Sequence, residues 1–132
     1  MITKLFSYIM TGLSAFFLPI SWALISTIVI IGIDTVTGVM AAGKNDVKSI
    51  ESRKMGRVVS KIIYYFSAII ICQIASLYID DQIPFVKLSL VAIMIIEVKS
   101  IDENFRKTFG FSFVDKLLKG FKRLNRKDNE KN

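Results

Sequence analysis

Residues 20–42 read ISWALISTIVIIGIDTVTGVMAA, and Asp34 is the only charged residue among them. A helix of about 20 apolar residues crosses the ~30 Å hydrocarbon core of a bilayer, so this stretch is long enough to span it. A carboxylate near the membrane centre costs about 2.5–3.5 kcal/mol, which the many Leu, Ile and Val side chains offset at about 0.3–0.6 kcal/mol each. We therefore predict a transmembrane helix with Asp34 near its middle, and Asp34 is the first residue to consider for function.

The composition of the whole chain is that of a membrane protein with room for one domain. Of its 132 residues, 52% are hydrophobic and the mean hydropathy is +0.49, which is too apolar for an ordinary soluble fold of this size. The chain has no His and a single Cys, Cys72, inside an apolar run. Metal sites, Cys–His nucleophiles and disulfide frameworks need these residues. We therefore expect no enzyme, no cofactor and no metal.

Three further apolar segments predict an all-α integral membrane fold. Residues 5–18 have apolar side chains at helical spacing and stop before Pro19, which favours an N-terminal interfacial helix, with a re-entrant helix as the alternative. Residues 62–79 are uncharged and predict a second span. Residues 83–101 are long enough for a third span if Lys87 extends to the membrane surface, and a re-entrant segment is the alternative. The expected fold has about three transmembrane helices.

The distribution of charge predicts the orientation of these helices. With three spans, the basic segment of residues 43–61, interpreted as a loop, lies on the same side of the membrane as the C-terminal tail. That side then holds sixteen of the eighteen Lys and Arg residues, because only Lys4 and Lys87 lie opposite. Cytoplasmic loops are enriched in Lys and Arg. We predict that the N-terminus is outside and the C-terminus inside.

Residues 110–132 form a basic cytoplasmic tail after a membrane domain of residues 1–109. Residues 111–127 fit an amphipathic helix with apolar side chains on one face and cations over the rest. Such a helix binds anionic lipid, at about 1 kcal/mol for each cation near the surface. Nucleic acid is a weaker alternative because no known reading module is present. The apolar face comprises Phe111, Val114, Leu117, Leu118, Phe121 and Leu124, and the predicted lipid-facing cations are Lys116, Lys119, Lys122, Arg123, Arg126 and Lys127.

Small and polar residues form a stripe on the first predicted span. At steps of three and four residues the stripe contains Ala23, Thr27, Ile31, Asp34, Gly38 and Ala41 or Ala42, while Ile25, Val29, Val36 and Met40 face away. Small residues let helices approach closely in lipid, where interhelical hydrogen bonds add to the association. The stripe predicts either a subunit or pore interface or packing within one chain, in which case Asp34 is bonded to Gln73 of the second span.

Four ordered pieces of the chain, spanning about residues 20–105, resemble the toxin-secretion/phage-lysis holin family. The first is Asp34-Thr35-Val36-Thr37-Gly38 with Ala41 and Ala42, the second contains Ser49, Ser52, Arg53, Lys54 and Gly56, the third is a span that Lys61 opens and Asp80 ends, and the fourth contains Glu97, Ser100, Ile101, Glu103 and Asn104. The positions that match the family pattern are Asp34, Thr37, Gly38, Gly56, Lys61, Glu97 and Asn104.

The resemblance implies a small phage or prophage protein of the bacterial host's cytoplasmic membrane. Holins of this family assemble with copies of themselves and open lesions that release or activate a peptidoglycan hydrolase. Two alternatives of other classes stay open. One is a membrane scaffold or secretion accessory that docks a cytoplasmic partner without forming holes, and the other is an ion conductor with Asp34 as a relay.

Overall fold

The computed structural model describes the backbone of residues 1–43, 47–79 and 82–129, and side chains within residues 1–43, 55–79 and 82–123. Every regular element within these ranges is a helix, which confirms the all-α prediction for the described part of the chain. In chain order they are α1 Ile2–Phe17, the 3-10 turn η1 Leu18–Ile20, α2 Ser21–Ala42, α3 Val47–Tyr78, α4 Phe85–Phe109 and α5 Phe113–Asn129.

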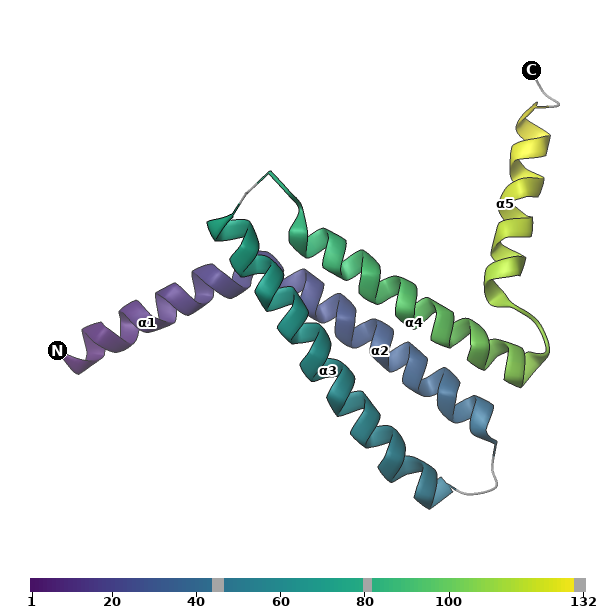
Figure 1. Ribbon diagram of the computed structural model, residues 1–132, viewed down its shortest axis with the longest axis horizontal. Coiled ribbons are helices and arrows are strands. Elements are labelled where there is room, and N and C mark those ends of the chain that lie inside the picture. Colours follow the sequence, from purple (N-terminus) through teal and green to yellow (C-terminus); the bar gives the residue numbers. More distant parts are fainter. Residues whose placement is uncertain (44–46, 80–81, 130–132) are drawn as a thin grey trace.

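Helices α2, α3 and α4 lie side by side as a bundle (Figure 1). Helices α2 and α4 run in the same direction and α3 runs opposite to both, so α2 ends beside the start of α3 and the end of α4. A thin apolar core, formed by Ile20, Ala23, Ile69 and Ile93, lies at the other end, near the connection between α3 and α4. The bundle therefore has an apolar end and, as described below, a polar one.

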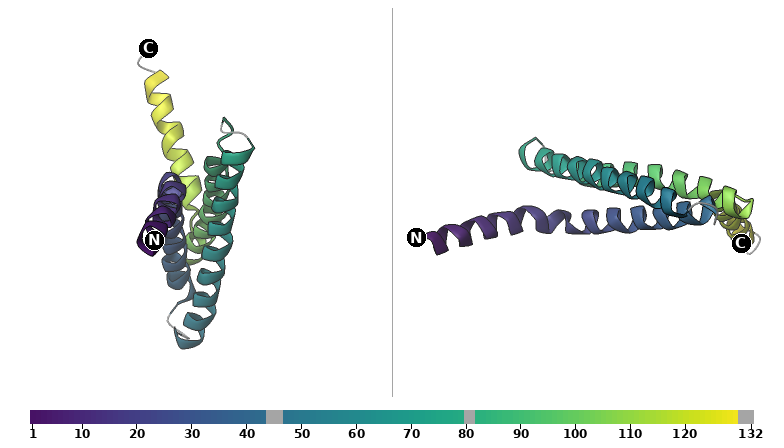
Figure 2. Two further views of the ribbon diagram at one scale, coloured as in Figure 1. Left: turned by 90° about the vertical axis from the view of Figure 1, so that its left-hand side faces the viewer. Right: turned by 90° about the horizontal axis from the view of Figure 1, so that it is seen from below.

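Helix α1 extends beyond the bundle (Figure 2) and meets α2 at a clear bend, which lies in the plane of Figure 1. Pro19 lies at this bend, in η1, where its missing N–H costs no helical hydrogen bond. Residues Ile2–Ala42 form one apolar helical stretch of 41 residues. At ~1.5 Å per residue this is about 60 Å, or about twice the ~30 Å hydrocarbon core. The interfacial position of residues 5–18 stays a prediction.

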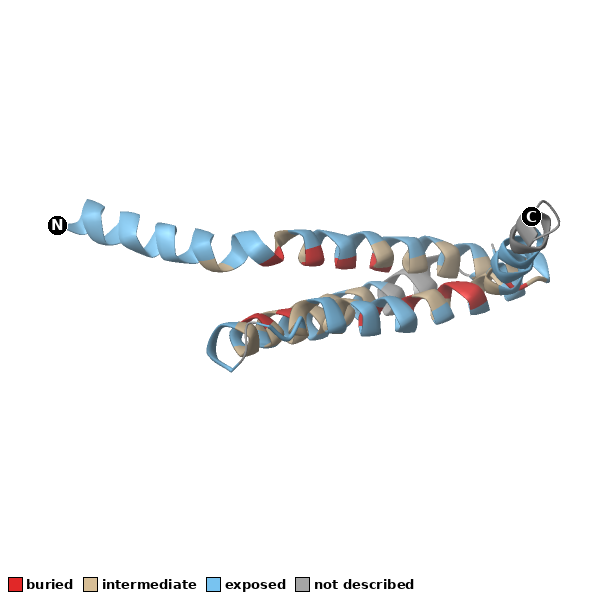
Figure 3. Ribbon diagram, turned by 90° about the horizontal axis from the view of Figure 1, so that it is seen from above, coloured by how far each residue is buried: buried red, intermediate tan, exposed pale blue. Residues whose placement is uncertain are grey.

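Many large apolar side chains are exposed on the bundle helices, whose buried and exposed faces Figure 3 distinguishes. On α2 the outward-facing Ile25, Val29, Val36 and Met40 are exposed, as the helical spacing predicts, while the opposite face is buried against the other helices. Exposed apolar patches of this extent mark surfaces that contact lipid or other proteins.

Within the part of the chain that the structure describes, two helical stretches are long and apolar enough to cross a membrane, Ile2–Ala42 and Met55–Tyr78. Helix α4 contains residues 85–101 of the predicted third span of residues 83–101 but is not among them, because charged residues interrupt it. It packs along α2 nonetheless. The third span stays a prediction.

The interpretation of residues 43–61 as a loop is wrong for most of that segment. Helix α3 begins at Val47 and continues to Tyr78. Residues 47–61 contain three Lys, two Arg, one Glu and one Met, which are good helix formers, and no Pro. Of the motif residues in this segment, the side chains of Ser49, Ser52, Arg53 and Lys54 lie outside the described residues, as do Asp80 and Asp81 further along the chain.

The elbow between α4 and α5 is held by Asp102. Its carboxylate accepts hydrogen bonds from the Val114 backbone N–H (3.0 Å) and the Ser112 hydroxyl (2.9 Å) and pairs with Arg106 (3.0 Å). Ser112 in turn accepts the Asp115 N–H (3.0 Å), which caps the start of α5. The tail helix therefore begins after residue 112, and Phe111 is in the elbow rather than on the amphipathic face.

Candidate functional site

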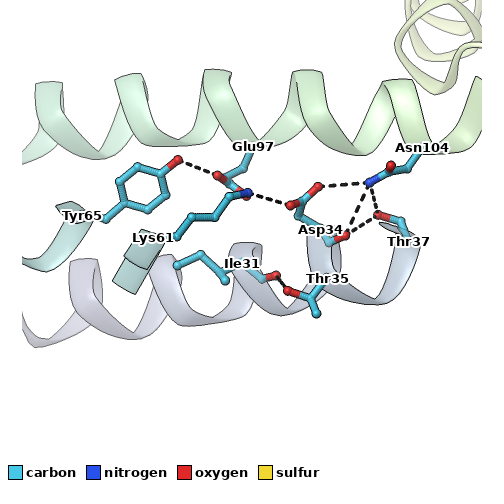
Figure 4. Close-up of polar contacts among 8 residues, drawn as sticks. All are labelled: Ile31, Asp34, Thr35, Thr37, Lys61, Tyr65, Glu97 and Asn104. Atoms are coloured by element: carbon cyan, nitrogen blue, oxygen red, sulfur yellow. Dashed lines mark hydrogen bonds and ion pairs between the residues drawn. The ribbon is translucent and has the colours of Figure 1, made fainter. Parts of the chain in front are cut away.

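A Lys61 side chain from α3 bridges two carboxylates, one on α2 and one on α4 (Figure 4). The Lys61 ammonium is 2.7 Å from Asp34 Oδ2 and 2.8 Å from Glu97 Oε2. The Glu97 side chain is 0% exposed, and those of Asp34 and Lys61 are 13% and 28% exposed. One cation therefore joins all three helices of the bundle.

The second oxygen of each carboxylate also has a donor. The Tyr65 hydroxyl donates to Glu97 Oε1 (2.6 Å), and the Asn104 amide donates to Asp34 Oδ1 (3.2 Å). The same amide nitrogen is 3.3 Å from the Thr37 hydroxyl oxygen. All four carboxylate oxygens thus accept a hydrogen bond, which is how a membrane protein tolerates ionisable groups away from water. We call Asp34, Thr37, Lys61, Tyr65, Glu97 and Asn104 the polar network.

Helical spacing explains how three helices supply this network. Lys61 and Tyr65 are four residues apart on α3, so both point to the same side. Gly38 follows Asp34 by four residues on α2 and faces Asn104, where an added Cβ would lie 3.3 Å from Asn104 Nδ2. A glycine at this position lets the Asn104 side chain lie close to the α2 backbone.

The polar network lies toward the end of the bundle where α2 ends and α3 begins. Asp34 precedes Ala42, the last residue of α2, by eight residues, which is about 12 Å of helix. If both carboxylates and Lys61 are ionised, the network has a formal charge of −1. Such a closed arrangement stabilises the contact between the helices. Within the described residues no group of three or more His, Cys, Asp or Glu side chains could hold a metal ion.

Most of the predicted polar residues lie close together in the structure, but their hydrogen-bond partners differ from the predicted ones. Asp34 is bonded within the chain, as one of the two readings predicts, but to Lys61 and Asn104, so the predicted bond to Gln73 is wrong. Gln73 is buried twelve residues beyond Lys61, about 18 Å further along α3. Thr27 is also buried, and its hydroxyl donates to the Ala23 carbonyl (2.8 Å).

The remaining predicted residues lie around the network or away from it. Ala42 is exposed at the end of α2, and a Cβ added at Gly56 would meet no atom within 4 Å. Sequence reasoning missed Tyr65 as a partner of Glu97. The signal available was its position one turn after Lys61.

The described cations of the tail are exposed. The Lys116 ammonium lies over the Phe111 ring, 3.3 Å from its centroid. Arg126 and Lys127 belong to α5, but their side chains lie outside the described residues.

Close to the elbow, the Val114 N–H, the Ser112 hydroxyl and Arg106 hold the pKa of the Asp102 carboxyl below its ordinary value, because each of them favours the charged form.

Comparison with known proteins gives one match. The family model described as the bacteriophage holin family matches residues 11–126, which is most of the chain. The matched region contains the whole polar network and the elbow. No curated protein and no solved structure matches the chain.

Proposed function

The chain belongs to the bacteriophage holin family, and we propose that it oligomerises in the bacterial cytoplasmic membrane and permeabilises it for release of a peptidoglycan hydrolase during lysis. The observation that supports this proposal best is the separation of polarity in the bundle. Charged and polar side chains from α2, α3 and α4 are joined inside it, while the outward faces are apolar. Such a subunit is stable in lipid as long as its polar network stays closed.

Assembly then uses the outward faces rather than the small-residue stripe of α2. Ala23, Thr27 and Ile31 of that stripe are already buried within the chain. The outward faces of α1, α2 and α3 carry large exposed apolar side chains, including Phe6, Trp22 and Tyr64. We place the contacts between subunits on these faces.

Opening requires the helices to part at the polar network. Separation of α2 from α4 exposes Asp34, Lys61, Glu97 and Asn104, which can then line a hydrated hole instead of bonding one another. The membrane potential acts on the same groups, because one charge moved through the full potential changes the free energy by about 2.3 kcal/mol per 100 mV. Loss of the potential is therefore the trigger that we propose.

The bundle end that contains the network faces the cytoplasm in this proposal, with the N-terminus outside. The basic tail helix α5 then lies on the anionic inner surface. Its exposed Leu117, Leu118 and Phe121 enter the interface, and the neighbouring lysines contact phosphate groups.

Lysis of bacteria that also make a cytosolic muralytic enzyme without a signal sequence tests the proposal. Induction of both proteins should give abrupt depolarisation, followed by appearance of the enzyme outside the membrane and lysis. Neither protein alone should cause rapid lysis. A scaffold would leave the membrane intact at matched expression, and a selective ion conductor would depolarise the cell while the enzyme stayed inside. Either result, with abundant inserted protein, contradicts the proposed function.

A further inference from the structure

A cavity of about 370 Å³ lies beside the polar network, at the end of the bundle where α2 stops. Side chains of α2, α3 and α4 line it, and its volume is near the lower end of the ~300–1,000 Å³ found for small-molecule sites. The polar network closes one side of it through Asp34, Lys61 and Asn104. The cavity is therefore formed by the same three helices that Lys61 joins.

Three cations line the cavity, Arg57 and Lys61 from α3 and Lys107 from α4. Lys61 is already paired with two carboxylates. Arg57 and Lys107 are exposed and form no ion pair with any residue that the structure describes. Among the lining residues that the structure describes, Asp34 is the one acidic residue, and both of its carboxylate oxygens are occupied by Lys61 and Asn104. The charge that remains available to a ligand is positive.

The remaining lining is apolar or neutral. Val58 and Ala42 contribute apolar surface, and Ser100 contributes a hydroxyl group. Close to the cavity along α2, the apolar side chains of Val39 and Met40 are exposed. A cationic site at the end of membrane helices, next to apolar surface, has the chemistry of a phospholipid: an anionic phosphate attached to acyl chains. Basic pockets between helices on the cytoplasmic side bind lipid head groups in this way.

We propose that this cavity binds the head-group phosphate of one anionic phospholipid, with Arg57 and Lys107 as its cationic ligands. Arg57 supplies the planar donor pair that suits phosphate oxygens, and Lys107 supplies a point charge from the facing helix. A lipid held there joins α3 to α4 at the end where Lys61 joins them internally. The site is distinct from the surface of α5, and its occupancy does not depend on hole formation.

Native mass spectrometry of the full chain in detergent tests this inference, with phosphatidylglycerol, phosphatidylcholine and inorganic phosphate as probes. The parent protein should retain one phosphatidylglycerol and no phosphatidylcholine. Arg57→Gln/Lys107→Gln should lower the retained fraction at least tenfold. The matched control Lys4→Gln/Lys87→Gln also removes two exposed cations, but on residues outside the cavity, and should retain the lipid as the parent does.

The exchanged pair Arg57→Lys/Lys107→Arg keeps both charges and should restore retention, which separates loss of binding from loss of folding. Equal retention by Arg57→Gln/Lys107→Gln and the parent overturns the proposal, as does equal retention of phosphatidylcholine. Displacement of phosphatidylglycerol by millimolar inorganic phosphate would assign the cavity to a free anion and contradict a lipid site. A protein that binds the lipid but fails the lysis experiment would contradict the proposed function and leave this inference standing.

Discussion

The Lys61 ammonium lies 2.7 Å from the Asp34 carboxylate, although the two residues are 27 positions apart in the chain. The contact places the only charged residue of residues 20–42 against a cation of α3, and the same cation also reaches Glu97 on α4. Neither carboxylate has to face lipid alone. The free energy of inserting Asp34 is therefore lowered by the fold itself.

Lys61→Met should destabilise the bundle strongly. It leaves Asp34 and the fully buried Glu97 without their common cation, and breaking a buried ion pair costs about 3–5 kcal/mol. Lys99→Met is the matched control, because Lys99 is exposed on α4 and changes of this kind at exposed sites usually stay within about 0.5 kcal/mol. Thermal unfolding of the purified proteins in detergent measures both. Equal melting temperatures for the two variants would show that the bridge does not hold the bundle together.

Tyr65→Phe should cost about 1.5–3 kcal/mol, because it removes one hydrogen bond to a buried carboxylate and keeps the ring. Tyr64→Phe removes a hydroxyl from the neighbouring residue, which is 72% exposed, and should have little effect. Chemical unfolding of both variants checks the difference. A Tyr65→Phe protein as stable as Tyr64→Phe would mean that the hydroxyl contributes nothing to the network.

Gly38→Ala and Gly32→Ala should change stability in opposite directions. A Cβ at Gly38 would lie 3.3 Å from Asn104 Nδ2, so the amide must shift away from Asp34, whereas a Cβ at Gly32 meets no atom within 4 Å. Gly32→Ala should then gain up to about 1 kcal/mol of helix propensity. Melting temperatures in the same detergent distinguish the two. Stabilisation of similar size by both substitutions would contradict the close α2–α4 contact.

Docking of α5 should be lost on acidification. Asp102 lies outside the two apolar stretches long enough to span the membrane, and the Val114 N–H, Ser112 and Arg106 lower its pKa. A carboxyl whose pKa is lowered by folding stabilises the fold above its unfolded pKa of about 3.9, and this stabilisation is lost as the pH falls through the lower folded pKa. Asp102→Asn should have a loosened elbow at every pH.

Spin labels on cysteines that replace Lys99 and Lys119, in a Cys72→Ala background, report the geometry of this elbow. The distance distribution should be narrow at neutral pH and broaden only at strongly acidic pH, while Asp102→Asn should be broad throughout. A parent protein whose distribution does not change down to acid unfolding of the helices would rule out Asp102 as the residue that holds α5.

Helical periodicity was enough to predict which face of α2 is buried. Ala23, Thr27 and Ile31 are buried, as their spacing indicates. Periodicity shows which face of a single helix is buried, but it does not show how far two helices are shifted along each other. That shift decides whether Asp34 meets Lys61 or Gln73 on α3. The sequence interpretation also used Lys61 as a boundary of the apolar span, which removed it from the possible partners of Asp34.

The extent of α3 was missed for a related reason. An apolar stretch shows which part of a helix can lie in lipid, but it does not show where the helix begins. Helix α3 starts at Val47, before the apolar stretch that begins at Met55. Pro19 was expected to separate an interfacial helix from the first span, and the chain does change direction at η1, between α1 and α2. Proline is tolerated in the first positions of a helical turn, so the chain stays helical on both sides of the bend.

The central claim is that α2 and α4 must separate at the polar network before the membrane becomes permeable. Gly38→Cys/Asn104→Cys in a Cys72→Ala background can test it, because a Cβ at position 38 lies 3.9 Å from Asn104 Cγ. A disulfide between these positions would lock the two helices together, and reduction of the same protein would release them. The oxidised and the reduced protein carry the same substitutions. Any effect of these substitutions on folding is therefore the same in both.

Release of a fluorescent dextran from proteoliposomes is the decisive measurement. The fully cross-linked protein should retain the dextran, and addition of a membrane-permeant reductant should start its release to the level of the protein that was never oxidised. Release from the fully cross-linked protein at the same rate as from the reduced protein would show that the helices need not part and would contradict the claim.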